Sequence, residues 1–303
     1  MKPSLNDKLS VIGVSMDLGA GTAGVSLGPA ALRYAGIIER LENIGYDVND
    51  TGDIVANKPE SAITEGTHLK NLGEVSRVNK LLCERVDSEM SQGRFPLVLG
   101  GDHSIAIGTI AGVLQHKKNL GVIWFDAHGD INTAETSPSG NIHGMPVAVS
   151  LGHGHESLTE IGGDDKKIKS ENIVFIGCRD LDAGERKMLK AFGITVFTMH
   201  EVDRMGMTEV MNRAIAIASE GTDGIHVSFD VDSLDPTHAI GTGTRVPGGL
   251  TYRESHLALE MIAETNKVVS AEFVEVNPII DIKNQTAKLT VELIGSLMGE
   301  WLI

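Results

Sequence analysis

The fold of this chain is decided by a segment that reads LGVIWFDAHGD, residues 120–130. Residues 120–125 carry no polar hydrogen-bonding side chain except the indole of Trp124, which is typical of a strand buried on both faces of a parallel sheet. Directly after this strand come two aspartates and a histidine. In open parallel sheets, ligands bind beyond the carboxyl ends of the strands. The segment therefore predicts a central strand with a functional site at its end.

The same alternation of strand-like and helix-like stretches runs along the whole 303-residue chain. Stretches of strand length, most of them apolar runs, predict strands over residues 9–14, 47–53, 95–100, 120–126, 172–177, 194–198, 224–230 and 268–274. Amphipathic stretches predict helices over residues 29–44, 69–91, 104–116, 184–191, 207–219, 252–264 and 286–298. This order predicts an α/β fold with a mostly parallel central sheet and helices on both faces. Because no repeat or linker interrupts it, we expect a single domain over residues 1–303.

Composition excludes some classes of protein. The net charge of −15 argues against a nucleic-acid-binding protein, which would carry a basic surface, and weakly favours a partner that is a cation. No apolar run reaches membrane-spanning length, and the polar residues 1–6 do not resemble a signal peptide. We therefore expect no membrane partner and a cytoplasmic location. Cys83 and Cys178 lie among apolar residues, so we expect buried thiols outside any disulfide framework.

Three other predicted strands also end in acids or imidazoles, in the sequences GGDHS (residues 100–104), DVDSLDP (residues 230–236) and EVNP (residues 275–278). Ionisable groups gathered at one edge of a sheet are costly unless cations compensate their repulsion. A single such segment would fit a solvated acidic turn, but its repetition at several strand ends favours a metal site. The predicted ligands are His103, Asp126, His128, Asp130, Asp230 and Asp232.

This set of ligands is larger than one ion needs and suits two ions bridged by carboxylates. Alternation along an extended backbone is expected to place Asp126, His128 and Asp130 on one face, and Asp230 and Asp232 likewise. Oxygen ligands with a minority of imidazoles favour manganese, with iron, cobalt or nickel as alternatives. Two ions about 3.5–4 Å apart can hold a bridging water and lower its pKa. The sequence therefore predicts two divalent cations, with manganese favoured, that could supply a hydroxide at neutral pH for a hydrolytic reaction.

The segments at residues 100–104, 126–130 and 228–236, in this order, resemble those of the ureohydrolase family, which includes arginases and agmatinases. The likeness extends from GPAALR at residues 28–33 to residues 272–278. Within the family, SPSGNIHGMP at residues 137–146 resembles the arginase loop that reads the amino acid end of arginine. The resemblance implies a three-layer α/β/α fold, two manganese ions and assembly as a homotrimer or homohexamer. It also implies hydrolysis of L-arginine to L-ornithine and urea by a hydroxide that bridges the two ions.

The resemblance also implies catalytic roles. Asp130 would accept a hydrogen bond from the attacking hydroxide, and His143 would protonate the leaving amine. Glu275 would pair with the guanidinium group of the substrate. Thr244 would lie beside the substrate or behind a metal ligand. The alternatives are that His143 only packs in its loop and that Glu275 only forms a structural ion pair.

Polar loop side chains are implied to recognise the α-groups of the substrate. Asn132, Ser139 and Asn141 would hydrogen-bond the α-carboxylate. Asp182, with help from Glu185, would meet the α-ammonium group. Polar loop residues also cap helices or face solvent, which is the alternative for each of them.

Three other functions compete with an arginase. An agmatinase would have no use for a loop that reads an α-carboxylate, and a catalytically silent binding subunit should lack metal ligands. A metal-dependent amide hydrolase would need neither Glu275 nor that loop. The chain also departs from the usual arginase pattern at Ile240 and Arg245, where many members have proline. Neither residue is a predicted ligand, so we expect any effect on a loop or a subunit contact.

Overall fold

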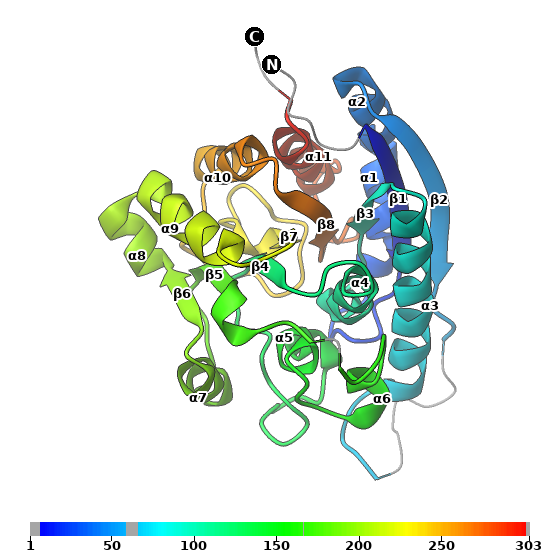
Figure 1. Ribbon diagram of the computed structural model, residues 1–303, viewed down its shortest axis with the longest axis vertical. Coiled ribbons are helices and arrows are strands. Elements are labelled where there is room, and N and C mark those ends of the chain that lie inside the picture. Colours follow the sequence, from blue (N-terminus) through cyan, green and yellow to red (C-terminus); the bar gives the residue numbers. More distant parts are fainter. Residues whose placement is uncertain (1–6, 59–65, 166, 301–303) are drawn as a thin grey trace.

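A parallel sheet forms the centre of the molecule. The computed structural model describes residues 7–58, 66–165 and 167–300, and the polar segment 1–6 lies outside them. The sheet has eight strands in the order β2-β1-β3-β8-β7-β4-β5-β6, and every pairing between neighbours is parallel (Figure 1). The strands are β1 (Lys8–Ser15), β2 (Asp47–Val55), β3 (Phe95–Leu99), β4 (Leu120–Phe125), β5 (Ile173–Cys178), β6 (Thr195–Thr198), β7 (Gly224–Asp230) and β8 (Val268–Val274). This confirms the predicted α/β fold and each predicted strand.

Helices cover both faces of the sheet, so the fold has three layers (Figure 1). Along each strand, successive side chains point to opposite faces, and two apolar cores result. The first core lies under α1 (Gly28–Tyr34), α2 (Ile37–Ile44), α8 (Met199–Met205), α9 (Met207–Ser219), α10 (Tyr252–Glu264) and α11 (Gln285–Leu297). The second lies under α3 (Leu72–Ser91), α4 (Ala106–Val113), α5 (Pro146–Ser150), α6 (Glu156–Thr159) and α7 (Ala183–Phe192).

The helices differ from the prediction in two respects. The single helix expected over residues 29–44 is wrong, because α1 ends at Tyr34 and α2 begins at Ile37. Gly36 between them has a φ of 90°, a left-handed conformation that cannot continue a right-handed helix. The short helices α5, α6 and α8 were not predicted. Helix α8 has a sequence signal that could have found it, a capping box formed by Thr198 and Glu201.

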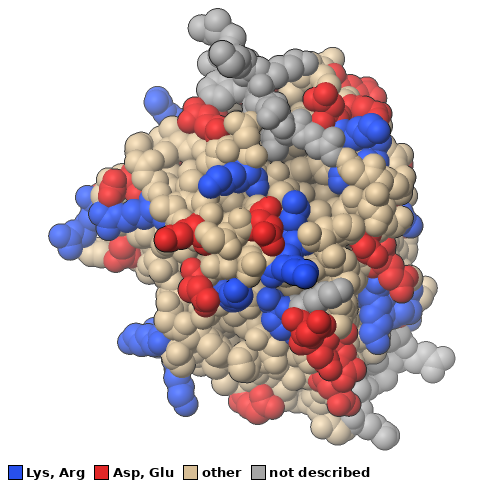
Figure 2. Space-filling view, viewed as in Figure 1, with Lys and Arg blue, Asp and Glu red and all other residues tan. Residues whose placement is uncertain are grey.

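The surface agrees with the composition. On the face shown in Figure 2, lysine and arginine side chains are interspersed with aspartate and glutamate, and they form no extended basic surface. No helix within the described residues is long and apolar enough to span a membrane. Cys83 and Cys178 are buried, as expected.

Candidate metal centre

The predicted ligands meet because of the order of the strands. Strands β3, β8, β7 and β4 are consecutive in the sheet, although their chain order is different. Each of these strands is followed by one of the four polar segments singled out in the sequence. Since all strands are parallel, their carboxyl ends lie at the same edge of the sheet. Segments spread between residues 100 and 278 thus converge on one site.

His103 is the centre of a first cluster. Its Nδ1 atom lies 3.2 Å from Asp126 Oδ2, 3.0 Å from Asp130 Oδ2 and 3.2 Å from Asp230 Oδ2. His103 and Asp126 are fully buried. Despite the three oxygens around it, Nδ1 has no hydrogen-bond partner within the described residues. A buried nitrogen aimed at converging carboxylates fits a divalent cation.

His128 is the centre of a second cluster. Its Nδ1 atom lies 3.3 Å from Asp126 Oδ1 and 3.1 Å from Asp232 Oδ2. Asp126 belongs to both clusters and turns one carboxylate oxygen to each. His103 and His128 therefore lie at opposite ends of the site. The donor atoms suit two ions that share Asp126, and the six predicted ligands are brought together.

The backbone reaches this arrangement differently from the prediction. Strand β4 ends at Phe125, and Asp130 has a φ of 48°, so residues 126–130 are not extended. Likewise Asp232 lies in a 3-10 turn, where its N–H donates to Asp230 Oδ1 over 2.7 Å. The expectation that these ligand residues lie on one face of an extended strand was wrong. Turns at the strand ends, rather than strand alternation, gather the carboxylates.

The electrostatics of the cluster call for a cation. Burial and the negative charge of Asp126 raise the pKa of Asp130 to about 7. Burial and the charges of Asp232 and Asp126 raise the pKa of Asp230 well above its usual value. Desolvation and mutual repulsion therefore favour protons on Asp130 and Asp230 when nothing positive lies between them. Burial also acts to raise the pKa of Asp126, but its close contacts with the imidazoles of His103 and His128 hold that pKa well below its usual value. A divalent cation would reverse the preference for protons, because it is the largest local charge in such a site.

Glu275 and His143 form a pair beside the first cluster. Glu275 follows β8 with a φ of 66°, and its Oε1 accepts a hydrogen bond from the backbone N–H of His103 over 2.9 Å. His143 Nδ1 lies 3.1 Å from the same oxygen. Burial lowers the pKa of His143, but the hydrogen bond and charge of Glu275 outweigh it and raise the pKa to about 9. His143 therefore holds a proton at neutral pH.

A cavity of about 210 Å³ opens above the acidic cluster. Its lining includes residues of the acidic cluster and six residues of the following loop: Ser137, Pro138, Ser139, Asn141, His143 and Gly144. The predicted substrate-contacting residues on its wall are Asn132, Ser139, Asn141, Asp182, Glu185 and Thr244. Glu275 does not line the cavity, since it is only 2% exposed and lies behind it in contact with His143. Asp180 and Ser137 also line the cavity and were not predicted.

The segment that contains His68 and Lys70 holds the 137–141 loop in place. Gly140 has a φ of 70°, and a Cβ atom there would lie 2.3 Å from the backbone oxygen of His68. Its own carbonyl accepts a hydrogen bond from the backbone N–H of Lys70 over 3.0 Å. Lys70 Nζ also donates to Asn141 Oδ1 over 2.9 Å. The sequence offered no signal for Lys70, because it lies far along the chain from this loop.

Glu185 and Asp182 have a structural use on the opposite wall. Asp182 caps α7 and forms a capping box with Glu185. Glu185 Oε1 accepts hydrogen bonds from the backbone N–H groups of Gly129 (3.2 Å) and Asp130 (2.9 Å). Asn132 Nδ2 donates to Asp182 Oδ2 over 2.8 Å. Glu185 thus supports the turn that carries Asp130, and Thr244 supports another ligand by donating to Asp232 Oδ2 over 2.8 Å.

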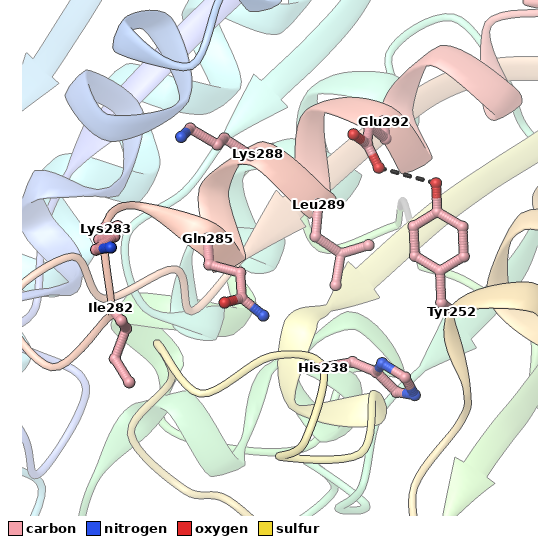
Figure 3. A pocket seen from close by; sticks show the side chains of 8 residues that line it. All are labelled: His238, Tyr252, Ile282, Lys283, Gln285, Lys288, Leu289 and Glu292. Carbon is pink, nitrogen blue, oxygen red and sulfur yellow. Dashed lines mark hydrogen bonds between the residues drawn. The ribbon is translucent and has the colours of Figure 1, made fainter.

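A larger hollow lies elsewhere and lacks this chemistry. It measures about 370 Å³ and is lined by residues of α10, of α11 and of the loops before them, including Lys283, Lys288 and Tyr252 (Figure 3). Tyr252 donates a hydrogen bond to Glu292 across one end of it (Figure 3). Its lining does not contain the convergent carboxylates and imidazoles found at the strand ends.

Comparison with known proteins agrees with this geometry. The sequence model of the Arginase family matches residues 7–299. The chain belongs to the arginase family. An arginase from Bacillus caldovelox is 60% identical over 304 residues, which cover 100% of both chains, and one from Brevibacillus brevis is 56% identical over 99% of this chain and 100% of its own. A solved structure of arginase from Bacillus caldovelox superimposes with a TM-score of 0.95, at 60% identity and 100% coverage of each chain.

Two departures from the usual arginase pattern meet in space. Arg245 Nη1 donates to the backbone oxygen of Ile240 over 3.3 Å in an exposed loop. Neither residue lines the cavity above the acidic cluster.

Sequence reasoning also missed Trp124, although it lies in the segment that decided the fold. Its ring stacks on His103 with centroids 4.2 Å apart, and its Nε1 donates to Asp126 Oδ2 over 3.0 Å.

Proposed function

We propose that this member of the arginase family hydrolyses L-arginine to L-ornithine and urea, using two Mn²⁺ ions. The observation that carries the proposal is that one cavity combines the acidic metal cluster with the polar loop of residues 137–141. A guanidinium group would meet the cluster, and the α-groups would meet the loop. That loop favours arginine over agmatine, which has no α-carboxylate.

The residues proposed to hold the ions divide into two sets. His103, Asp126 and Asp230 would hold one, and Asp126, His128 and Asp232 the other. Asp130 lies beside His103 Nδ1 and can join the first set. When bound, the ions would supply Lewis acidity and a water of lowered pKa at neutral pH. Their identity as manganese is supported by the mixture of oxygen donors with few imidazoles.

The substrate's α-groups suit the cavity wall. Asn132, Ser139 and Asn141 offer polar side chains to an α-carboxylate, and the ammonium of Lys70 bonded to Asn141 adds positive charge on the same side. Asp182 and Asp180 lie on the wall with Glu185, where carboxylates suit an α-ammonium group. A substrate with both charges would be fixed in one orientation.

The reaction requires a proton donor and an acceptor at fixed places. Water adds to the guanidinium carbon, and the bond from that carbon to the ornithine nitrogen breaks. Asp130 would accept a hydrogen bond from the attacking oxygen. His143, whose raised pKa favours a proton at neutral pH, would give that proton to the leaving amine. Glu275 orients His143 and contributes negative charge for the guanidinium from behind the cavity.

The first experiment is urea release from L-arginine and from agmatine by protein loaded with Mn²⁺. We expect release from arginine and little from agmatine. In a matched pair, Asn141→Ala should raise KM for arginine about tenfold or more, whereas Tyr252→Phe, in the remote hollow, should leave KM unchanged. Release from agmatine alone would replace the proposed specificity while keeping the metal chemistry. No release from either would favour a binding subunit.

The proposal extends to the whole chain. We propose one domain over residues 1–303, because all eight strands form one sheet. A cytoplasmic location and a homotrimer or homohexamer complete the proposal. Sedimentation velocity of the purified protein tests the assembly, and a monomer would contradict it.

A further inference from the structure

A buried row of polar side chains lies beneath the proposed metal centre. On strand β7 the side chains of His226 and Ser228 point to the same face, and on the neighbouring β8 those of Ser270 and Glu272 do so. All four are fully buried. The opposite face of these two strands is apolar, with Val227 and the residues around it packed in the first core. Burying polar side chains in the middle of a sheet costs free energy unless they are hydrogen-bonded, so the partners of this row indicate its role.

The hydrogen bonds of this row lead to a predicted metal ligand. Ser228 Oγ lies 2.9 Å from Glu272 Oε1 and 2.8 Å from His103 Nε2. His226 Nε2 lies 3.3 Å from the same Glu272 oxygen, and His226 Nδ1 lies 2.8 Å from Ser270 Oγ. Glu272 is thus joined to the imidazole of His103 through a single hydroxyl group.

The direction of these bonds follows from chemistry. Ser228 Oγ donates its hydrogen bond to Glu272 Oε1, and His103 Nδ1, which faces three carboxylate oxygens, leaves Nε2 to carry the ring proton. A carboxylate only accepts hydrogen bonds. Ser228 must therefore donate its one proton to Glu272, and toward His103 it has only lone pairs to offer. The proton of His103 is then held at Nε2, and the lone pair of Nδ1 faces the acidic cluster.

We propose that Glu272, acting through Ser228, is a positioning residue that fixes the tautomer and ring orientation of His103 for the ion held at Nδ1. The inference rests on the proposed function, because it assigns residues to one ion of that centre. A ligand imidazole usually donates its other N–H directly to a carboxylate or carbonyl group. Here a serine lies between the imidazole and the carboxylate, and the same carboxylate oxygen also contacts a second buried histidine, His226.

The test is a titration of metal-free protein with Mn²⁺, in which free Mn²⁺ is followed by electron paramagnetic resonance. His103→Asn and His128→Asn, each expected to weaken one ion, assign the two binding steps. Glu272→Gln keeps the side-chain volume but adds an NH₂ donor, which lets Ser228 donate to Nε2 and moves the His103 proton to Nδ1. We expect the ion at His103 to bind about 10–100-fold more weakly, with the ion at His128 little changed. Ser228→Ala should weaken the same ion.

Ser270→Ala is the matched control, since it removes a buried serine hydroxyl from the same face without breaking the link to His103. It should leave the ratio of the two dissociation constants unchanged, and urea denaturation of each metal-free variant checks folding. If Glu272→Gln and Ser228→Ala bound both ions with the dissociation constants of the wild-type protein, the proposal would be overturned. Equal weakening of both ions in all three variants would also overturn it, because that result would indicate a general effect on stability. Binding is measured without substrate, so an absence of urea release would contradict the proposed function and leave this test intact.

Discussion

Single residues control the protons at this site. His143 has a side chain that is 19% exposed and a hydrogen bond to Glu275 that raises its pKa to about 9. Because the folded pKa lies above the ordinary value of 6.5, the charged form persists through neutral pH and is lost as the pH rises through about 9. The imidazole of His143 is thus available for the proposed role of proton donor over the neutral range, whereas an unperturbed histidine would be mostly neutral there.

His143→Ala should lower kcat by about 10²-fold or more below pH 9, the size expected for loss of a general acid. The deficit relative to wild type should shrink above pH 9, where the wild-type imidazole has also lost its proton. The pH–rate profiles of both proteins measure this, and the metal content by mass spectrometry should stay at the wild-type value. Undiminished turnover of the variant across neutral pH would remove His143 from the reaction.

At the scale of elements, close contact between helices and strands holds the ligand-bearing strands in register. Gly121 in β4 lies against α9, and a Cβ atom there would be 1.8 Å from the backbone oxygen of Ala218. No side chain can rotate away from such a contact, because both partners are backbone. The strand that carries Asp126 at its end therefore depends on a glycine five residues earlier.

Gly121→Ala should lower the free energy of unfolding by about 3 kcal/mol or more, since α9 must move from the sheet. Gly73→Ala is the control, because a Cβ atom in that turn of α3 meets nothing within 4 Å. It should leave stability unchanged or raise it by less than about 1 kcal/mol. Urea denaturation of the metal-free proteins measures both. Equal stability of the two variants would mean that the contact at Ala218 relaxes freely.

At the scale of the whole molecule, we expect metal binding and folding to be coupled. The ligands come from segments between residues 103 and 232, so the site exists only when the central strands are assembled. An ion that binds the folded state alone stabilises it by about 2.7 kcal/mol at a concentration 100 times its dissociation constant. It also removes the repulsion among the buried carboxylates of the metal-free site.

Removal of metal by a chelator should therefore lower the melting temperature by several degrees, and Mn²⁺ should restore it. Asp126→Asn, which alters the one residue shared by both clusters, should abolish most of this shift. Differential scanning calorimetry of both proteins, with and without Mn²⁺, measures it. If Mn²⁺ raised the melting temperature of the variant as much as that of the wild type, the stabilising ion would have to bind elsewhere.

The sequence by itself determined the strands and the class of fold, and it singled out the six residues proposed as metal ligands. A strand buried on both faces needs an apolar run such as residues 120–125, and polar residues directly after it mark the functional edge of a parallel sheet. These signals are local, and they suffice for β4 with Asp126 and for β7 with Asp230. The break between α1 and α2 at Gly36 was not predicted, because the spacing of apolar residues continues across it. Such spacing gives no information about a backbone dihedral angle.

Only the tertiary structure decided which strand ends meet. The order β3-β8-β7-β4 places His103, Glu275, Asp230 and Asp126 side by side, and no local pattern specifies the neighbours of a strand. The turns that give Asp130 and Glu275 positive φ are likewise held by distant partners, Glu185 for the first and Gly101 for the second. No local signal distinguishes Glu272 from other strand residues, and only the pairing of β8 with β7 places it next to Ser228. Chemistry at this site depends on long-range packing, because its donors come from parts of the chain that only the folded sheet brings together.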